Sequence, residues 1–312
     1  MNFKRIGILS IGEMGYHWAR VLRTHGVEVL SFVGDRSAAT RSRADSAGVE
    51  LVPSLEKLVS LVNVIVSIVV PFAAKQVAER VARALLNNRR TGLLYMDANA
   101  ISPMTAEEVN RILTQAHANY VDGCILGGAA NLDKGTVVYV SGPQASSLNP
   151  LSELGLCIKV LGPGVTQASA FKVIHAGLTK GLAGLLSELL VGAEKFGLLK
   201  EALADYERSY PGLPQKVGHS IASLPLHAAR RSEEMAELRE TFLHYGLDPI
   251  VVPSVEKILR AISDLKSDKE SPTNTHGETL VNTIKLFSER GLLRDRSSPK
   301  RPSRRKAFQQ EK

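Results

Sequence analysis

The chain has 312 residues, of which 44% are apolar and 22% charged, a composition typical of soluble globular proteins with about two domains. Its two cysteines are too few for a disulfide framework, and no basic and apolar leader precedes the first predicted strand, so we expect a cytoplasmic protein without a membrane span. The formal net charge is +8, but residues 294–312 hold +6 of it, so the rest is nearly neutral and nucleic acid is not an expected partner.

The N-terminal stretch predicts a strand, a glycine turn and a helix. An apolar run at 6–9 reads as a buried strand, and residues 16–24 carry apolar side chains at helical spacing. Such a turn at a helix N-terminus binds a pyrophosphate through free N–H groups and the helix dipole. Gly12 would let the phosphate approach, and Gly15 would let the helix pack closely, while Ser10 replaces the first glycine of the usual pattern. The residues expected to contact the cofactor here are Ser10, Ile11, Gly12, Glu13, Met14 and Gly15.

The residues after a second predicted strand, at 27–33, indicate which cofactor binds. An acid at this place binds the ribose hydroxyls of NAD, as Asp35 could, whereas an arginine favours the 2′-phosphate of NADP. Arg36 and Ser37 together make a phosphate clamp, and we therefore expect NADP, with NAD as the alternative.

Strands and helices then alternate, which predicts an α/β fold with a doubly wound parallel sheet. Strands are expected at 49–52, 64–70, 92–97, 120–123, 135–142 and 156–161, and helices at 55–62, 73–87 and 103–117. Ligands of such sheets bind beyond the carboxyl ends of the strands. This rule selects three loops and, within them, Val69 and Val70 for cofactor, Asn99 for cofactor and substrate, and Gly127 and Gly128 for substrate.

The second half of the chain predicts an all-helical domain. A long helix covers 165–199, and further helices are expected at 201–208, 214–224, 226–245, 253–266 and 278–290. We expect a dinucleotide-binding domain at 1–164, a helical substrate and dimerisation domain at 165–266, and a linker, short helix and disordered basic tail at 267–312. The tail resembles a nuclear-localisation or polyanion-binding patch, although a solubilising tail has the same composition.

Two features of the long helix point to function. Gly177, Gly181 and Gly184 leave one face without side-chain bulk, so we expect close packing against a partner subunit and hence a homodimer. Lys172 and His175 share another face, at the junction of the two predicted domains. A partly desolvated lysine there suits general acid/base work, although an ordinary solvated lysine is the alternative on position alone.

Residues 4 to about 265 resemble the 6-phosphogluconate dehydrogenase-like, or β-hydroxyacid dehydrogenase, superfamily. The resemblance lies in Ile11-Gly12-Glu13-Met14-Gly15, Arg36-Ser37, Asp97-Ala98-Asn99 and residues 122–128, and in a helical domain of poorly defined function with Leu178-Thr179-Lys180-Gly181 and residues 229–235. The superfamily's G-x-x-x-K-x-x-N motif has a general acid/base lysine, which the resemblance assigns to Lys172. Ala168 stands for its glycine and His175 for its asparagine.

The resemblance also limits the substrate. The superfamily's acid-binding Ser-Gly-Gly reads Leu126-Gly127-Gly128, so the hydroxyl that would hold a carboxylate is missing, and the chain is much shorter than true 6-phosphogluconate dehydrogenases. We expect an NADP-preferring oxidoreductase that transfers a hydride between nicotinamide and a small hydroxy or carbonyl compound, without a metal.

In this reading Lys172 moves the proton, Asn99 and the Gly127-Gly128 backbone orient the substrate, and His175 either bonds the substrate or packs between helices. Two alternatives remain. One is an imine reductase, although such enzymes commonly replace the lysine with another proton donor. The other is a non-catalytic NADP-binding regulator, which the replacements at Ser10, Leu126 and His175 keep open.

Overall fold

The computed structural model describes residues 3–34, 37–265 and 279–293. The chain forms two compact units, Met1–Ala176 and Gly177–Lys312, with the boundary inside a long helix. Arg36, residues 266–278 and the basic tail at 294–312 lie outside the described residues. The sequence-based expectations for these residues are therefore not tested by the structure.

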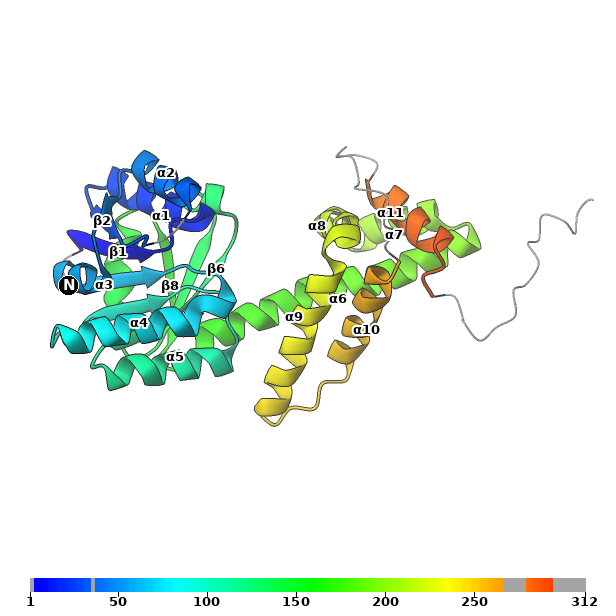
Figure 1. The fold of residues 1–312 in the computed structure, drawn as a ribbon. Coiled ribbons are helices and arrows are strands. Elements are labelled where there is room, and N and C mark those ends of the chain that lie inside the picture. The colour runs from blue at the N-terminus through cyan, green and yellow to red at the C-terminus, as the bar shows by residue number, and fades with distance from the viewer. Residues whose placement is uncertain (1–2, 35–36, 266–278, 294–312) are drawn as a thin grey trace, which may run out of the picture. The chain divides into compact units, whose positions relative to one another are not determined.

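The first unit is built on one eight-stranded sheet in the order β3-β2-β1-β4-β5-β6-β7-β8 (Figure 1). Its strands are β1 (Arg5–Leu9), β2 (Glu28–Ser31), β3 (Glu50–Leu51), β4 (Val64–Ser67), β5 (Leu94–Asp97), β6 (Asn119–Leu126), β7 (Val137–Ser141) and β8 (Cys157–Gly162). The order reverses at β1, which lies between β2 and β4. This makes the carboxyl end of β1 the topological switch point, where doubly wound sheets bind ligands.

The expected α/β doubly wound fold is confirmed, but the expectation that every strand is parallel is wrong for the last two. β7 pairs with β6 in the antiparallel direction, and β8 then runs parallel to β7. The reason lies in the connection at 127–136, which turns the chain back through a single 3₁₀ turn at Ala129–Asn131. A parallel return needs a crossover of a dozen or more residues, usually containing a helix.

Helices cover both faces of the sheet: α1 (Glu13–Thr24), α2 (Ala38–Ser46), α3 (Leu55–Leu61), α4 (Ala74–Asn87) and α5 (Pro103–Gln115) (Figure 1). Two apolar cores result. Val64 and Val66 of β4 point into one core with Trp18, and Ile65 between them points into the other. Because both faces are buried, the central strands are continuously apolar, which is why the sequence reveals them as runs rather than as alternation.

The described residues of the second unit form helices and no strand. The helices are most of α6 (Gln167–Phe196), which begins in the first unit, followed by α7 (Leu199–Ser209), α8 (Leu213–Ala222), α9 (Leu224–His244), α10 (Val251–Ser263) and α11 (Thr279–Glu289). α9 and α10 lie side by side as an antiparallel pair, and α8 packs on α11 (Figure 1).

The glycines of α6 pack mainly within the chain. A Cβ atom built on Gly177 would lie 2.5 Å from Leu238 Cδ2, and one on Gly184 would lie 3.1 Å from Ile258 Cγ2. These two glycines therefore allow α6 to approach the chain's own α9 and α10, rather than a partner subunit as expected. Gly181 is different, because a Cβ there would meet no atom within 4 Å.

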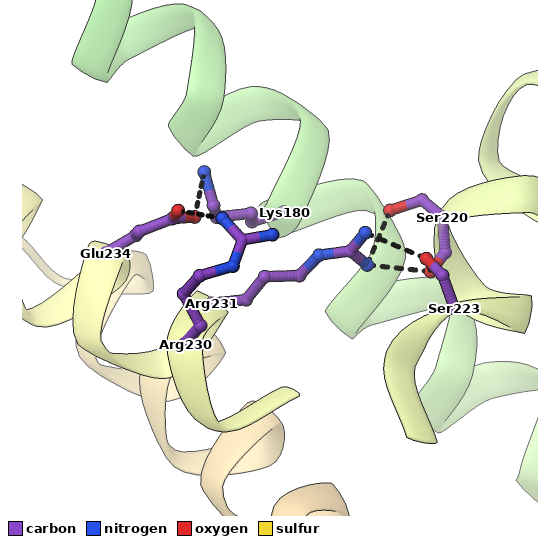
Figure 2. Close-up of polar contacts among 6 residues, drawn as sticks. All are labelled: Lys180, Ser220, Ser223, Arg230, Arg231 and Glu234. Atoms are coloured by element: carbon purple, nitrogen blue, oxygen red, sulfur yellow. Dashed lines mark hydrogen bonds and ion pairs between the residues drawn. The ribbon is translucent and has the colours of Figure 1, made fainter. Parts of the chain in front are cut away.

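Polar side chains connect the helices of the second unit (Figure 2). Arg231 of α9 donates to Ser220 O at 2.7 Å and to Ser223 Oγ at 2.8 Å, and so caps the C-terminal end of α8. Burial, together with the neighbouring Arg230, lowers the pKa of the Arg231 guanidinium. Glu234 of α9 accepts from Arg230 and pairs with Lys180 Nζ of α6 at 2.8 Å. The resembling segments 178–181 and 229–235 thus meet in one structural network.

Among the described residues one helix, α6, is long and apolar enough to cross a membrane by length and composition, with 33% of its most apolar stretch buried. A single such helix is weak evidence, since core helices of soluble proteins meet the same criterion.

Candidate functional site: two cavities at the switch point

The glycine turn between β1 and α1 has the geometry of an anion site. A Cβ on Gly15 would lie 2.1 Å from the Ser10 carbonyl oxygen, so only glycine lets α1 pack on the turn. At Gly12 the nearest atom to such a Cβ is Ser10 Oγ at 3.8 Å, which leaves that side open to a ligand. Gly12 is also the N-cap of α1 and provides no side-chain cap, so the first N–H groups of the helix are available to an anion.

Three further residues of the turn, Ser10, Ile11 and Glu13, differ in how their side chains are placed. Ser10 has a φ of 76°, the left-handed region that favours glycine, in keeping with its place as the first glycine of the usual pattern. Ile11 is fully buried in the core beside Trp18, and Glu13 is exposed as the first residue of α1. The Ile11 side chain therefore belongs to the apolar core, and only the backbone of this residue is available to a ligand at the turn. Neither Ile11 nor Glu13 is on the wall of the two cavities described next.

A first cavity of about 400 Å³ lies at the ends of β1, β2 and β4. Its volume is in the range of small-molecule pockets. Ser10, Val69 and Val70 are on its wall, as the sequence suggests, whereas Phe32 and Arg80 are additions. The Arg80 guanidinium lies 5.9 Å from the centre of the Phe32 ring. The full wall is Leu9, Ser10, Phe32, Val33, Gly34, Thr40, Leu55, Val69, Val70, Phe72, Ala73, Gln76, Val77 and Arg80.

The proposed phosphate clamp is described in part. Ser37 is exposed and its hydroxyl accepts from Thr40 N at 3.4 Å, so it caps α2. Arg41 donates to the Gly34 carbonyl oxygen and so links α2 to a wall residue of the first cavity. Arg36, the cation of this clamp, lies outside the described residues. Ser37 is not itself on the wall of the first cavity, but its hydrogen-bond partner Thr40 is.

A second cavity, of about 250 Å³, contains most of the residues expected to do chemistry. Its wall is formed by Met14, Ile68, Val69, Pro71, Ala98, Asn99, Ala100, Cys124, Ile125, Gly127 and Lys172. Val69 lines both cavities, so they meet at the loop after β4. The sequence predictions for Met14, Asn99, Gly127 and Lys172 therefore converge on one place, although these residues come from four different segments.

Lys172 is the only charged residue on the wall of the second cavity among the described residues. It lies in the first part of α6, and its Nζ donates to the Ile125 carbonyl oxygen at 2.8 Å. The side chain is half-buried, and its neighbours on the wall are largely apolar. An ammonium group in such a setting has lost much of its hydration, which strengthens its interaction with any oxygen placed beside it.

Asn99 holds the wall of this cavity through hydrogen bonds to the protein. Its Oδ1 accepts from Val69 N at 2.6 Å, and its Nδ2 donates to Ser67 Oγ at 3.2 Å. Only 3% of the residue is exposed. These bonds tie the loop after β5 to the loop after β4, so Asn99 shapes the site in addition to any contact with a ligand.

Of the three other residues predicted to contact substrate, Gly127 is on the wall of the second cavity, whereas Gly128 and His175 are not. Gly127 has a φ of 138°, and a Cβ there would lie 2.2 Å from Thr136 Oγ1, so this position requires glycine. Gly128 is not on the cavity wall, and its carbonyl oxygen accepts from Thr136 Oγ1 at 2.7 Å. His175 is exposed and is likewise not on the wall. The structure does not bring His175 to this cavity, because one further turn of α6 carries it past the wall.

Two neighbouring carboxyl groups lie in the strands that lead into the second cavity, and the sequence predictions assign a role to neither. Asp97 of β5 and Asp122 of β6 are partners in register and are both buried. Asp97 Oδ1 accepts from Asn99 N at 3.0 Å, while burial raises the pKa of Asp97 to about 7. The rule on strand ends could have found both residues, since each lies in or at the end of a strand that leads into a predicted ligand loop.

Burial of Asp97 predicts a pH-dependent stability. Since its folded-state pKa of about 7 exceeds the unfolded value, this group favours folding at low pH, and that contribution is lost as the pH rises through 7. Asp97→Asn keeps an acceptor for Asn99 N and removes the ionisation. We expect the variant to gain about 3 kcal/mol of unfolding free energy over wild type between pH 5 and pH 8, by urea denaturation. Exposed Asp45→Asn is the control, and parallel pH profiles for Asp97→Asn and wild type would contradict the assignment.

Among the described residues no group of three or more His, Cys, Asp or Glu side chains is placed to hold a metal ion. The second cavity does contain Cys124, but burial raises the pKa of its thiol to about 12. The raised pKa favours the neutral thiol over the nucleophilic thiolate at neutral pH.

Comparison with known proteins decides the family. A family model described as the NAD binding domain of 6-phosphogluconate dehydrogenase matches residues 5–161. The chain belongs to this family. Residues 193–262 match a second model, a domain of unknown function known as DUF1932. The expected resemblance is thereby confirmed for both halves of the chain, and the first unit is an NAD(P)-binding domain.

Relatives extend over most of the chain. It is 28% identical over 261 residues to an uncharacterised 28.5 kDa protein of Methanothermus fervidus, covering 83% of this chain and 99% of the relative. The solved structure of conserved protein MTH1747, described as of unknown function but structurally similar to 3-hydroxyacid dehydrogenases, is 30% identical with a TM-score of 0.73, covering 83% and 97% of the two chains. A probable mitochondrial 3-hydroxyisobutyrate dehydrogenase of Dictyostelium discoideum is 25% identical over 146 residues, which is 47% of this chain and 45% of that one.

Proposed function

We propose that this protein is an NADP-preferring oxidoreductase that transfers a hydride between nicotinamide and a small hydroxy or carbonyl compound, with Lys172 as the general acid/base. The observation that carries the proposal is the Lys172 amine, the one charged group on the largely apolar wall that the described residues form around the second cavity, which meets the switch-point cavity at Val69. Proteins similar to this chain include a probable hydroxyacid dehydrogenase, which favours the same reaction class.

The residues present fit an extended dinucleotide. Its adenosine end matches the 400 Å³ cavity beside Phe32 and Arg80, and its pyrophosphate matches the open side of Gly12. The nicotinamide end would then reach the second cavity past Val69, with Met14 beside it. When bound there, the cofactor supplies or accepts the hydride, and the protein provides position and a proton.

Lys172 provides that proton. When a carbonyl compound is reduced, its oxygen gains negative charge, and the ammonium stabilises this charge and then donates a proton to form the hydroxyl. In the oxidation of an alcohol the neutral amine takes the hydroxyl proton as the hydride leaves. The Ile125 carbonyl oxygen, which accepts from Nζ at 2.8 Å, holds the amine at the wall until a substrate oxygen competes for it. Gly127, required at its position by Thr136, keeps backbone rather than a side chain beside the substrate.

A turnover assay tests the proposal. The purified protein is offered NADPH with small aldehydes, keto acids and a cyclic imine, and NADP⁺ with 3-hydroxyisobutyrate and serine. We expect turnover of a hydroxy or carbonyl compound. Reduction of the imine alone would favour an imine reductase, and tight cofactor binding without any turnover would favour a regulator and overturn the proposal.

Cofactor choice makes a separate prediction. Arg36→Ala should weaken NADPH binding by about 10- to 100-fold, because a guanidinium bonded to the 2′-phosphate contributes roughly 1.5–3 kcal/mol. NADH lacks that phosphate, so its Kd should change by less than about twofold. Fluorescence titration of both cofactors measures the two constants, with Arg43→Ala as the control. Equal losses for NADH and NADPH would contradict the clamp.

We also propose a homodimer formed along α6. Within the second unit its exposed apolar side chains include Leu185, Leu189 and Phe196, with exposed fractions of 53%, 46% and 80%. Cβ atoms on Gly181 and Gly192 would meet no atom within 4 Å, so a second helix backbone has room to approach. A symmetric dimer buries the same stripe on both copies, which removes a large apolar surface from water.

The proposed dimer predicts that substitutions in the exposed apolar stripe of α6 lower the molecular mass measured in solution from that of a dimer to that of a monomer. Light scattering at micromolar concentration should give a dimer for the wild type, whereas Leu185→Glu with Leu189→Glu should give a monomer, since each buries a charge in the apolar contact. Lys200→Glu on the exposed side of α7 is the control. A monomeric wild-type protein, or one that partitions into liposomes instead, would contradict the proposal.

A further inference from the structure

Side chains from the sheet cap the first turn of α6. The first N–H groups of any helix lack partners within the helix. In α6, Ala168 N donates to Ser141 Oγ at 2.9 Å and Ser169 N donates to Asp122 Oδ2 at 2.7 Å. The Ser169 hydroxyl adds a bond to Asp122 Oδ1 at 2.6 Å. The cap of α6 is therefore tertiary, provided by β6 and β7 rather than by a preceding residue.

This cap is a buried, fully bonded unit. Asp122 and Ser141 are partners in register on β6 and β7, and their side chains are 3.4 Å apart. Asp122, Ser141 and Ser169 are exposed by only 0%, 0% and 1%. A buried carboxylate is tolerated where both oxygens accept hydrogen bonds and a helix N-terminus provides positive potential, and Asp122 has both. Burial raises its pKa to about 6, and the bonds from Ser169 oppose that rise.

The same strand holds α6 at a second point. Three residues after Asp122 on β6, the Ile125 carbonyl oxygen accepts from Lys172 Nζ at 2.8 Å, and Lys172 follows Ser169 by three residues on α6. One contact fixes the start of the helix and the other receives the lysine amine one turn later. Without the first contact, the first turn can fray, and the long lysine side chain no longer starts from a fixed point.

We propose that Asp122 is the positioning residue for Lys172: by capping α6 through Ser169, it holds the lysine amine in the second cavity. The inference rests on the proposed function, in which that amine moves the proton. It assigns to Asp122 an effect on kcat rather than on cofactor affinity, because the glycine turn that would hold the pyrophosphate belongs to β1 and α1.

Kinetics of Asp122→Asn, Ser169→Ala and the double variant test this, with 3-hydroxyisobutyrate and NADP⁺ as first probes. An asparagine has one acceptor oxygen: if that oxygen accepts from Ser169 N, the amide nitrogen faces the Ser169 hydroxyl, which can no longer donate, and the negative charge at the helix N-terminus is lost. We expect Asp122→Asn to lower kcat by about 30-fold or more, since small misplacements of catalytic groups cost up to about 100-fold. The Kd for NADPH should stay within about twofold of wild type. Exposed Asp133→Asn is the control.

The double variant decides whether Asp122 acts through Ser169. Because both changes remove the same contact, Ser169→Ala should have little further effect on Asp122→Asn, about twofold at most. Multiplicative losses, an unchanged kcat in Asp122→Asn, or an equal loss of NADPH affinity would each overturn the inference.

A second readout does not depend on turnover. Trace acetylation followed by mass spectrometry measures the reactivity of the Lys172 amine relative to the exposed Lys57. We expect the relative rate to rise by about threefold or more in Asp122→Asn, since the amine loses its hydrogen bond to the Ile125 carbonyl oxygen. If the wild type turns over no compound, the proposed function fails, while the acetylation ratio still decides the inference: a raised ratio supports the anchor and an unchanged or lowered ratio overturns it.

Discussion

Replacing Lys172 with methionine should lower kcat by about 10²- to 10⁴-fold, the usual contribution of a positioned general acid/base. Methionine matches the length of the lysine stem and suits the apolar wall formed by Met14, Ile68 and Cys124. The fold should therefore persist. The Kd for NADPH should change by less than about threefold, because the phosphates would lie at the glycine turn and not at α6.

Two comparisons make this result specific. Lys57→Met changes an exposed lysine of α3 and should leave kcat at the wild-type value. Stopped-flow measurement of a single turnover with NADPH reports the chemical step itself, so that slow product release cannot hide the loss. A Lys172→Met protein with near wild-type single-turnover rates would remove the proton-transfer role and leave only cofactor binding.

Two glycines of the turn should separate folding from cofactor binding. Gly15→Ala places a Cβ 2.1 Å from the Ser10 carbonyl oxygen, so α1 or the turn must move. Overpacking against backbone typically lowers the unfolding free energy by about 1–3 kcal/mol or more. Gly12→Ala has its nearest atom at 3.8 Å, so the free energy of unfolding should change by less than about 1 kcal/mol.

Both variants should lose cofactor affinity, for different reasons. In Gly12→Ala the new methyl group occupies the space through which a pyrophosphate approaches, and we expect the NADPH Kd to rise by at least about 50-fold. In Gly15→Ala the turn is distorted as well, so affinity and stability fall together. Urea denaturation and fluorescence titration measure the two quantities on the same samples. Wild-type affinity in Gly12→Ala would show that the phosphates bind elsewhere.

Local patterns in the sequence predicted most of the fold. Apolar runs located the strands because central strands are buried on both faces, and the glycine turn marked the switch point. The direction of β7 was missed, since a run of apolar residues has no direction and only the short connection at 127–136 reveals the reversal. The close contacts of Gly177 and Gly184 were assigned to a partner subunit because their true neighbours, Leu238 and Ile258, are distant in the sequence.

The sequence predicted the site residues whose role follows from their residue type and their place in a loop. It missed the residue whose role depends on a contact between segments distant in the sequence. Met14, Asn99, Gly127 and Lys172 line one cavity, as strand ends and the family resemblance indicated together. Asp122 lies in a segment that the resemblance covers, but its role depends on Ser169, whose hydroxyl it binds at a separation of 47 residues along the chain. His175 occupies a motif position yet is not on the cavity wall. The spacing of a motif determines where a residue lies on a helix, but not how far along that helix the cavity extends.

The central claim is that the Lys172 amine lies beside a bound nicotinamide ring, and a crystal structure of the NADP⁺ complex tests it most directly. The account predicts the pyrophosphate at the N–H groups following Gly12, the adenosine beside Phe32 and Arg80, and the reactive ring carbon within about 5 Å of Lys172 Nζ, close enough for one substrate oxygen to lie between them. A nicotinamide ring outside the second cavity, or more than about 10 Å from that nitrogen, would contradict it.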